Sequence, residues 1–122
     1  MGGKLSSLDT DSEDVIVMLL STPACPVVSL QLNYLDRPGR RAVIVNTDEF
    51  TVEADLIRGT LTVNSNCETF AVTRDDTYRS MHAAALAGDT QMLCTAEEGL
   101  ATIELIEAAE RAAARGEWVT NE

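Results

Sequence analysis

Few side chains in this sequence could do nucleophilic or metal chemistry. The 122-residue chain has one histidine, His82, and three widely spaced cysteines, Cys25, Cys67 and Cys94. These residues exclude a multi-histidine metal site, and they fit neither a C-x-x-C metal clip nor a disulfide framework. His82 has no neighbouring base or nucleophile in the sequence, so we interpret it as a packing or boundary residue. The cysteines are typical of buried, reduced thiols, which favours a cytoplasmic protein.

Carboxylate pairs and glycines give no catalytic or cofactor signal either. The acidic pairs 75–76 and 97–98 fall in the first turns of predicted helices, where negative charge complements the helix dipole. The seven glycines never follow the G-x-G-x-x-G or G-x-x-x-x-G-K order of a dinucleotide or phosphate cradle. We therefore expect no catalytic residue, no metal ligand and no bound cofactor in this chain.

One basic cluster stands out against the acidic background. Arg37, Arg40 and Arg41 lie close together around a predicted turn. Arginine forks can hold a carboxylate or a phosphate, which makes the three arginines candidate substrate contacts. They could equally pair with Asp36 or Asp48 at the end of a strand, and the sequence leaves both interpretations open.

The charge balance narrows the classes of partner. Nine basic residues stand against 20 acidic ones, for a net charge of −11. Nucleic acid and anionic membrane surfaces would repel such a chain. The longest apolar run, residues 15–20, is too short to span a bilayer. The length and the ordinary composition predict one globular domain over residues 1–122.

The pattern of apolar residues predicts strands first. Candidate strands cover residues 15–20, 28–34, 41–45 and 50–56, followed by short strands at 61–63 and 70–72. Tight turns between consecutive strands favour an open, largely antiparallel sheet of about five to six strands. The polar side of that sheet is either solvated or an interface for a homo-oligomer, and its candidate interface residues are Ser29, Gln31, Asn33, Thr51 and Glu53.

Two helices are predicted to follow the strands. Thr73 is the expected cap of the first helix, and Gly88 ends it. Thr95 and Glu98 form a capping box for the second helix, which Gly116 ends. The apolar stripe expected to face the sheet from that helix is Leu100, Ile103, Ile106 and Ala109 or Ala113. An edge strand is expected at 117–120, and the fold class is α+β, with both helices covering one sheet face.

The end of the chain carries a family resemblance. Residues 95–100 (TAEEGL), 105–111 (LIEAAER) and 116–119 (GEWV) resemble the C-terminus of the Gfo/Idh/MocA family of NAD(P)-dependent oxidoreductases. Residues 12–15 (SEDV) and 33–38 (NYLDRP) resemble two strand ends of the same family, so the resemblance spans about residues 4–119. Residues 47–50 depart from it, because they replace the family's glycine turn.

The resemblance implies a C-terminal domain without the parts of the enzyme that bind the cofactor and carry out the reaction. The family's dinucleotide-binding Rossmann domain, its lysine-proline motif and its histidine-aspartate motif have no counterpart here, and His82 matches none of them. The implied role is subunit pairing through the open sheet face and part of the substrate cleft, in a parent enzyme that uses NAD or NADP on a sugar or polyol. This chain alone would be inactive. The alternative is a stand-alone, non-enzymatic module that dimerises or binds a partner.

Overall fold

The computed structural model describes residues 2–73 and 75–120, and it has the expected α+β class. The chain divides into two compact units. The first contains the residues up to Leu35 and those from Cys94 onward, and the second runs from Asp36 to Leu93. No helix among the described residues is long and apolar enough to cross a membrane.

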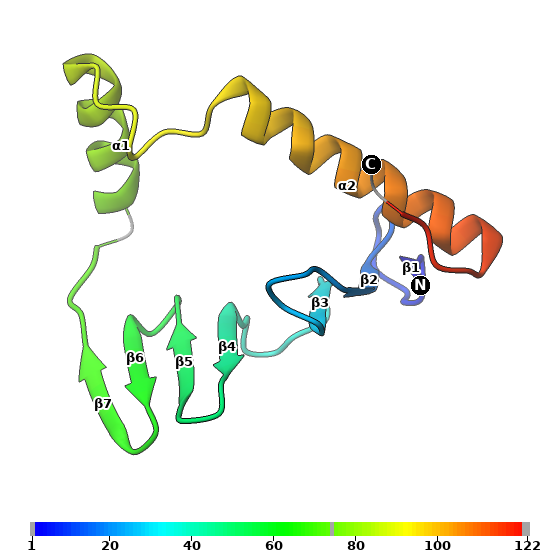
Figure 1. The fold of residues 1–122 in the computed structure, drawn as a ribbon, viewed down its shortest axis with the longest axis horizontal. Coiled ribbons are helices and arrows are strands. Elements are labelled where there is room, and N and C mark those ends of the chain that lie inside the picture. The colour runs from blue at the N-terminus through cyan, green and yellow to red at the C-terminus, as the bar shows by residue number, and fades with distance from the viewer. Residues whose placement is uncertain (1, 74, 121–122) are drawn as a thin grey trace. The chain divides into compact units, whose positions relative to one another are not determined.

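The first unit contains a three-stranded antiparallel sheet in the order β1-β2-β3 (Figure 1). Its strands are β1 (Gly2–Gly3), β2 (Val15–Leu20) and β3 (Val28–Asn33). The β2–β3 register places Ile16 opposite Leu32 and Met18 opposite Leu30, so one face of the sheet is apolar.

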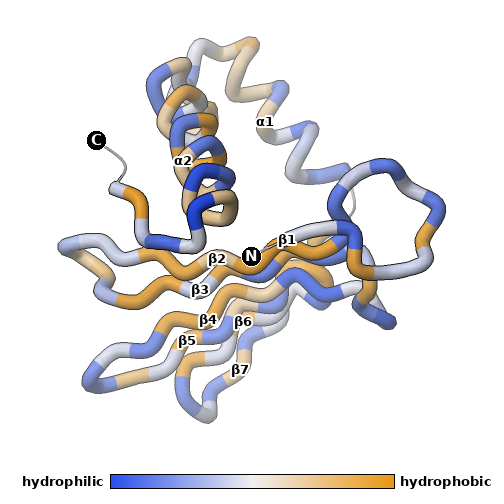
Figure 2. Tube along the Cα trace, turned by 90° about the vertical axis from the view of Figure 1, so that its right-hand side faces the viewer, coloured by the Kyte–Doolittle hydropathy of each residue, from blue (hydrophilic) through white to orange (hydrophobic). Residues whose placement is uncertain are grey.

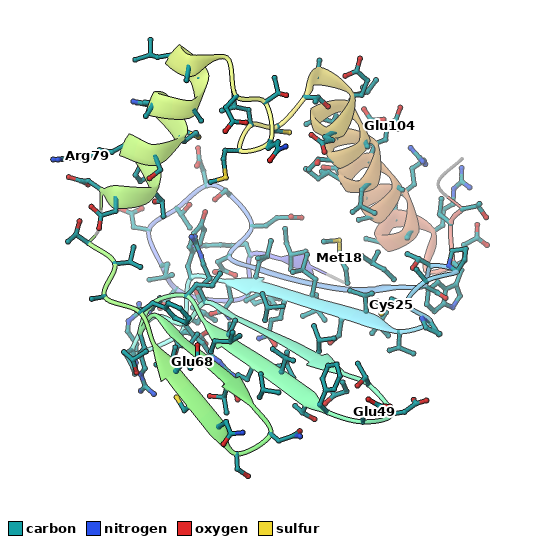
Figure 3. All side chains as sticks on the ribbon, turned by 60° about the vertical axis from the view of Figure 1, so that its left-hand side comes forward. Met18, Cys25, Glu49, Glu68, Arg79 and Glu104 are labelled. Atoms are coloured by element: carbon teal, nitrogen blue, oxygen red, sulfur yellow. The ribbon has the colours of Figure 1, made fainter. Side chains whose placement is uncertain are left out.

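Helix α2 (Ala96–Arg115) lies over this sheet (Figure 2). The side chain of Met18 points from the sheet toward the helix (Figure 3). On the helix side, Ala108 is buried, with only 6% of its surface exposed, and Leu105 and Ala112 are half-buried. The core of the first unit is therefore small, and Ala108 is its one buried apolar side chain among the described residues.

The ends of α2 confirm the sequence prediction. The Thr95 hydroxyl accepts a hydrogen bond from the Glu98 amide, and the Glu98 carboxylate accepts one from the Thr95 amide at 2.8 Å. Gly116 ends the helix in the left-handed conformation, and Glu107 pairs with Arg111 at 3.9 Å. These contacts are local, which is why the sequence alone predicts them.

The side of α2 that faces the sheet differs from the prediction. Leu100, Ile103 and Ile106 are exposed, and of the predicted stripe only Ala109 is half-buried. The most buried residues of the helix are instead Ala108 and, to a lesser degree, Leu105, Ala109 and Ala112. The expected edge strand at 117–120 was also wrong, since none of these residues is in a strand.

The buried carboxylate of Asp14 organises the start of the chain. Asp14 is only 1% exposed, and its two oxygens accept hydrogen bonds from the amides of Leu5 at 2.7 Å and Ser6 at 2.9 Å. The Ser6 hydroxyl also donates to it, and the Lys4 ammonium lies 3.6 Å away. The backbone of Asp14 bonds to Gly3 and Tyr34. The loop before β2 is therefore folded around one side chain.

These contacts lower the pKa of Asp14 from 3.8 to about 2, chiefly through the Ser6 hydroxyl and the Leu5 amide. A carboxyl group with a lowered pKa in the folded state stabilises the fold above its unfolded pKa. We expect this stabilisation to be complete above about pH 4 and to be lost as the pH falls toward 2. Urea unfolding followed by circular dichroism across that pH range measures the loss.

The matched variants are Asp14→Asn and Asp9→Asn, the latter at an exposed carboxyl group in the same loop. Asp14→Asn should lower the urea midpoint at neutral pH and accelerate hydrogen exchange at the Leu5 and Ser6 amides, while Asp9→Asn should change neither. Equal urea midpoints for the two variants at neutral pH would contradict the role of Asp14.

The second unit contains a four-stranded antiparallel sheet in the order β4-β5-β6-β7 (Figure 1). Its strands are β4 (Ala42–Asn46), β5 (Thr51–Asp55), β6 (Thr60–Val63) and β7 (Asn66–Thr69). The single sheet of about five to six strands was therefore wrong, because the strands form two hydrogen-bonded sheets of three and four. Residues 34–41 form a long connection, which does not impose a strand register as a two-residue hairpin would.

Two further predictions in the second unit need correction. The strand expected at 70–72 lies earlier, at β7, because Asn64 adopts a positive φ of 52° and turns the chain at once. Helix α1 (Asp76–Ala87) ends at Gly88 as predicted, but Thr73 does not cap it. The Asp76 carboxylate instead accepts a hydrogen bond from the Thr73 amide at 2.7 Å, and hydrogen bonds from Thr73 lower the pKa of Asp76.

Candidate functional site

An apolar face of the second sheet is the surface that stands out in this structure. Between β4 and β5, the register pairs Val43 with Ala54 and Val45 with Val52. Between β5 and β6, it pairs Ala54 with Leu61 and Val52 with Val63. Residues paired in this way point to the same side of a sheet. We call this set the valine face: Val43, Val45, Val52, Ala54, Leu61 and Val63.

Within the second unit, the described part of helix α1 does not pack on the valine face. Val43 is 53% exposed and Val45 is 49% exposed, while Val52, Ala54 and Leu61 are half-buried by their neighbours in the sheet. Contiguous apolar surface of this kind marks an interaction site in soluble proteins. The other side of the same sheet is largely polar and carries Glu53 and Thr62 in one register row.

Two side-chain-bonded turns set the register that builds the valine face. The Thr47 hydroxyl accepts a hydrogen bond from the Phe50 amide at 3.1 Å and so closes the β4–β5 turn. The Asp55 carboxylate accepts hydrogen bonds from the amides of Ile57 and Arg58, both at 2.9 Å. The hydrogen bond from the Arg58 amide is the main reason that the pKa of Asp55 is lowered. Both turns lie at the ends of the strands, beside the valine face.

Gly59 and Asn64 close the remaining strand ends. Gly59 has a positive φ of 67°, and an added Cβ would lie 2.5 Å from the Phe70 carbonyl oxygen. The Asn64 side-chain oxygen accepts a hydrogen bond from the Thr51 amide at 3.0 Å, and the Asn64 amide donates to the Thr51 carbonyl at 2.9 Å. These contacts hold β5 and β6 in the register that aligns the valine face.

The arginine cluster lies at the start of the second unit. A guanidinium nitrogen of Arg37 donates to the Asp36 carbonyl at 3.1 Å, and the Arg41 carbonyl accepts from the Leu56 amide at 2.9 Å. The pKa of Asp55 is lowered mainly by the hydrogen bonds from the amides of Arg58 and Ile57, and the positive charge of Arg40 makes a smaller contribution in the same direction. Arg37 thus contacts the main chain of Asp36 and Arg40 acts on Asp55, whereas the alternative named the side chains of Asp36 and Asp48. Both the pairing with these two residues and a substrate role for the cluster stay predictions.

The five predicted interface residues fall on two different sheets. Ser29, Gln31 and Asn33 lie on one side of β3 in the first unit, whereas Thr51 and Glu53 lie on the polar side of β5 in the second. They do not form one sheet face, because the single sheet that would have joined them is divided. Their role in an interface stays a prediction.

The histidine and the three cysteines are all exposed. His82 is exposed on α1. The prediction of buried thiols was wrong, because Cys25, Cys67 and Cys94 are all exposed and unpaired by disulfides. The cysteines lie in connections or on the edge strand β7, where little packs over them. Among residues 2–73 and 75–120, no three metal-ligating side chains gather.

A second apolar surface lies at one end of the first unit. It is an open groove of about 400 Å³ lined by Leu19, Leu20, Ser21, Pro26, Val27 and Trp118. Its lining has almost no polar group that could orient a small ligand. The groove is therefore suited to apolar contact rather than to chemistry.

Part of the valine face is visible in the sequence. Val52 and Ala54 alternate with the polar residues Thr51, Glu53 and Asp55, whereas residues 42–45 of β4 are apolar without alternation. We expected the helices to cover that side and looked for an interface on the polar side. Only the structure shows that this apolar side is exposed.

Comparison of this chain with protein-family models, with curated proteins and with solved structures finds no match.

The role of the Gly59 turn in holding the strand register can be tested by substitution. Gly59→Ala should destabilise the fold by about 2 kcal/mol or more, because a Cβ is strained at this positive φ and meets the Phe70 carbonyl. Urea unfolding measures the change.

The control is Gly39→Ala, since nothing lies within 4 Å of a Cβ added at Gly39. We expect that variant to stay within about 0.5 kcal/mol of the parent chain. A Gly59→Ala protein as stable as Gly39→Ala would show that this turn does not hold the register.

Proposed function

We propose that this chain is the non-catalytic, interface-forming part of a cytoplasmic NAD(P)-dependent oxidoreductase that acts on a sugar or polyol. Its task is to pair subunits and to supply part of the wall of the substrate cleft. NAD or NADP would be held by the parent enzyme's dinucleotide-binding domain, and this chain supplies neither a cofactor site nor a catalytic group. Arg37, Arg40 and Arg41 are the proposed substrate contacts.

The observation that carries the interface part of the proposal is the exposed valine face. The six apolar side chains lie in register on one sheet face, and much of their surface is exposed to water. Burying this surface against another protein is therefore favourable. The resemblance implies that such a face packs against another subunit. We therefore propose a homo-oligomer in which this open sheet face is the contact.

The enzyme class is supported by the resemblance alone. Residues 95–111 carry it most strongly, and the confirmed capping box and the Glu107–Arg111 pair belong to that stretch. The capping box is a general helix-start device, so it supports the helix rather than the chemistry. The class of reaction therefore needs an independent test.

The test isolates the native polypeptide from source cells with an antibody against residues 97–111. We expect a polypeptide several times the mass of this chain that reduces NAD or NADP when supplied with a sugar or polyol. A native product of 122 residues that reduces neither dinucleotide would overturn the oxidoreductase proposal and favour a stand-alone binding module.

The interface is tested separately with two neighbouring residues that lie on opposite faces of β6. Val63→Glu puts a charge on the valine face, and Thr62→Glu puts the same charge on the polar face. Sedimentation equilibrium should show that Val63→Glu weakens self-association about tenfold or more, because a buried carboxylate is costly. Thr62→Glu should leave association unchanged, and equal effects from the two variants would argue against the valine face.

A further inference from the structure

The outer edge of β4 is unpaired, and its backbone groups are available for another strand. Within residues 2–73 and 75–120, β4 has only β5 as a hydrogen-bonded neighbour. The Leu56 amide donates to the Arg41 carbonyl, and the Thr47 amide donates to the Phe50 carbonyl. Because antiparallel hydrogen bonding alternates along a strand, the N–H and C=O groups of Ala42, Ile44 and Asn46 point to the free edge.

The composition of β4 lacks the features that keep an edge strand unpaired. Its sequence, AVIVN, contains no charge and no proline, and its central residue Ile44 is about half exposed. The opposite edge strand, β7, is polar and carries the charged residue Glu68 (Figure 3). Charge on an edge strand hinders pairing, and an uncharged β-branched edge favours it.

The charges that flank β4 are complementary under reversal of the strand. Arg40 and Arg41 precede it, and Asp48 and Glu49 follow it. We propose that β4 pairs, edge to edge and antiparallel, with β4 of a second copy of this chain. That arrangement brings Arg40 of each copy close to the β4–β5 turn of the other copy, which carries Asp48, and opposite charges on neighbouring antiparallel strands attract each other.

The alternation of backbone groups selects the register. The residues whose N–H and C=O groups point to the free edge must pair with each other. Ile44 therefore pairs with Ile44 of the second copy, and Ala42 pairs with Asn46. This register aligns the whole of β4 with its copy and is two-fold symmetric, as most protein dimers are. Val43 then lies opposite Val45 of the other copy, and the two valine faces become one continuous face over eight strands.

Two chains of net charge −11 repel each other at long range. At short range, the attraction within the arginine–aspartate pairs offsets part of that repulsion. At physiological salt the screening length is about 8 Å, so the close pairs persist while distant repulsion is reduced. Edge pairing does not rest on the oxidoreductase assignment, because it uses only the residues of β4 and its flanks.

Exchange of the two charges tests the pairing. Arg40→Asp and Asp48→Arg should each weaken the dimer about tenfold in sedimentation equilibrium at physiological salt, because each substitution creates two like-charge pairs. The double variant Arg40→Asp/Asp48→Arg should restore association to near the parent value. Arg40 also acts on Asp55, so the circular dichroism of every variant must match that of the parent chain.

A monomeric parent chain, or a double variant that does not recover association, would overturn the proposal. Val63→Glu separates the two contacts, since it charges the valine face two strands away from the β4 edge. A Val63→Glu chain that still dimerises, and still responds to the charge exchange, would support the edge contact while counting against the face contact.

Cross-linking tests the register directly. The three exposed native cysteines are replaced by serine, and a single cysteine is placed at Ile44 or at Thr62. Ile44 and Thr62 lie in one register row on the same face, but only Ile44 is on the outer edge. In the proposed dimer the two residues 44 have Cα atoms about 5.5 Å apart, within disulfide range.

Mild oxidation should therefore give a covalent dimer with Ile44→Cys and very little with Thr62→Cys, as judged on a non-reducing gel. Equal cross-linking at both positions would indicate random collision. Failure to cross-link at position 44 would show that the β4 edge does not meet itself. Either result would overturn the edge pairing.

Discussion

Antiparallel register is the constraint on which the second unit depends. The pairing of β4, β5 and β6 aligns six apolar side chains on one side of the sheet and the polar residues on the other. A slip of one residue would exchange the two sides, because side chains alternate along a strand. The Thr47, Asp55, Gly59 and Asn64 contacts hold this register at the strand ends. The exposed apolar face and the unpaired β4 edge are direct consequences of that alignment.

The first unit is held by a different kind of contact. One buried carboxylate, Asp14, accepts hydrogen bonds from the loop that precedes it, while its backbone bonds to Gly3 and Tyr34. A buried charge is tolerated only when its oxygens are satisfied, and here backbone amides and the Ser6 hydroxyl satisfy them. Helix α2 then lies over this sheet, with Ala108 buried (Figure 2). Each unit thus leaves some apolar surface exposed, on α2 in the first and on the sheet in the second.

The exposed apolar surface of the second unit is suited to contact with another protein chain. The valine face and the unpaired β4 edge belong to the same sheet and adjoin each other. A face contact and an edge contact can coexist, because one uses side chains and the other uses backbone groups. Two such contacts related by symmetry would build an oligomer larger than a dimer. The oxidoreductase proposal draws on the resemblance, and the interface proposals draw on the register.

The sequence by itself determined the local structure of this protein. It predicted β2, the alternation in β3 and β5, the Thr95–Glu98 capping box and the glycine ends of both helices, because each depends on residues within a few positions. Only the tertiary structure decided which strands share a sheet, which side of α2 meets it, and whether the thiols are buried. These features depend on contacts between distant segments. Part of the valine pattern was present in the sequence, but its exposure depends on what packs over it, and residue spacing does not encode that.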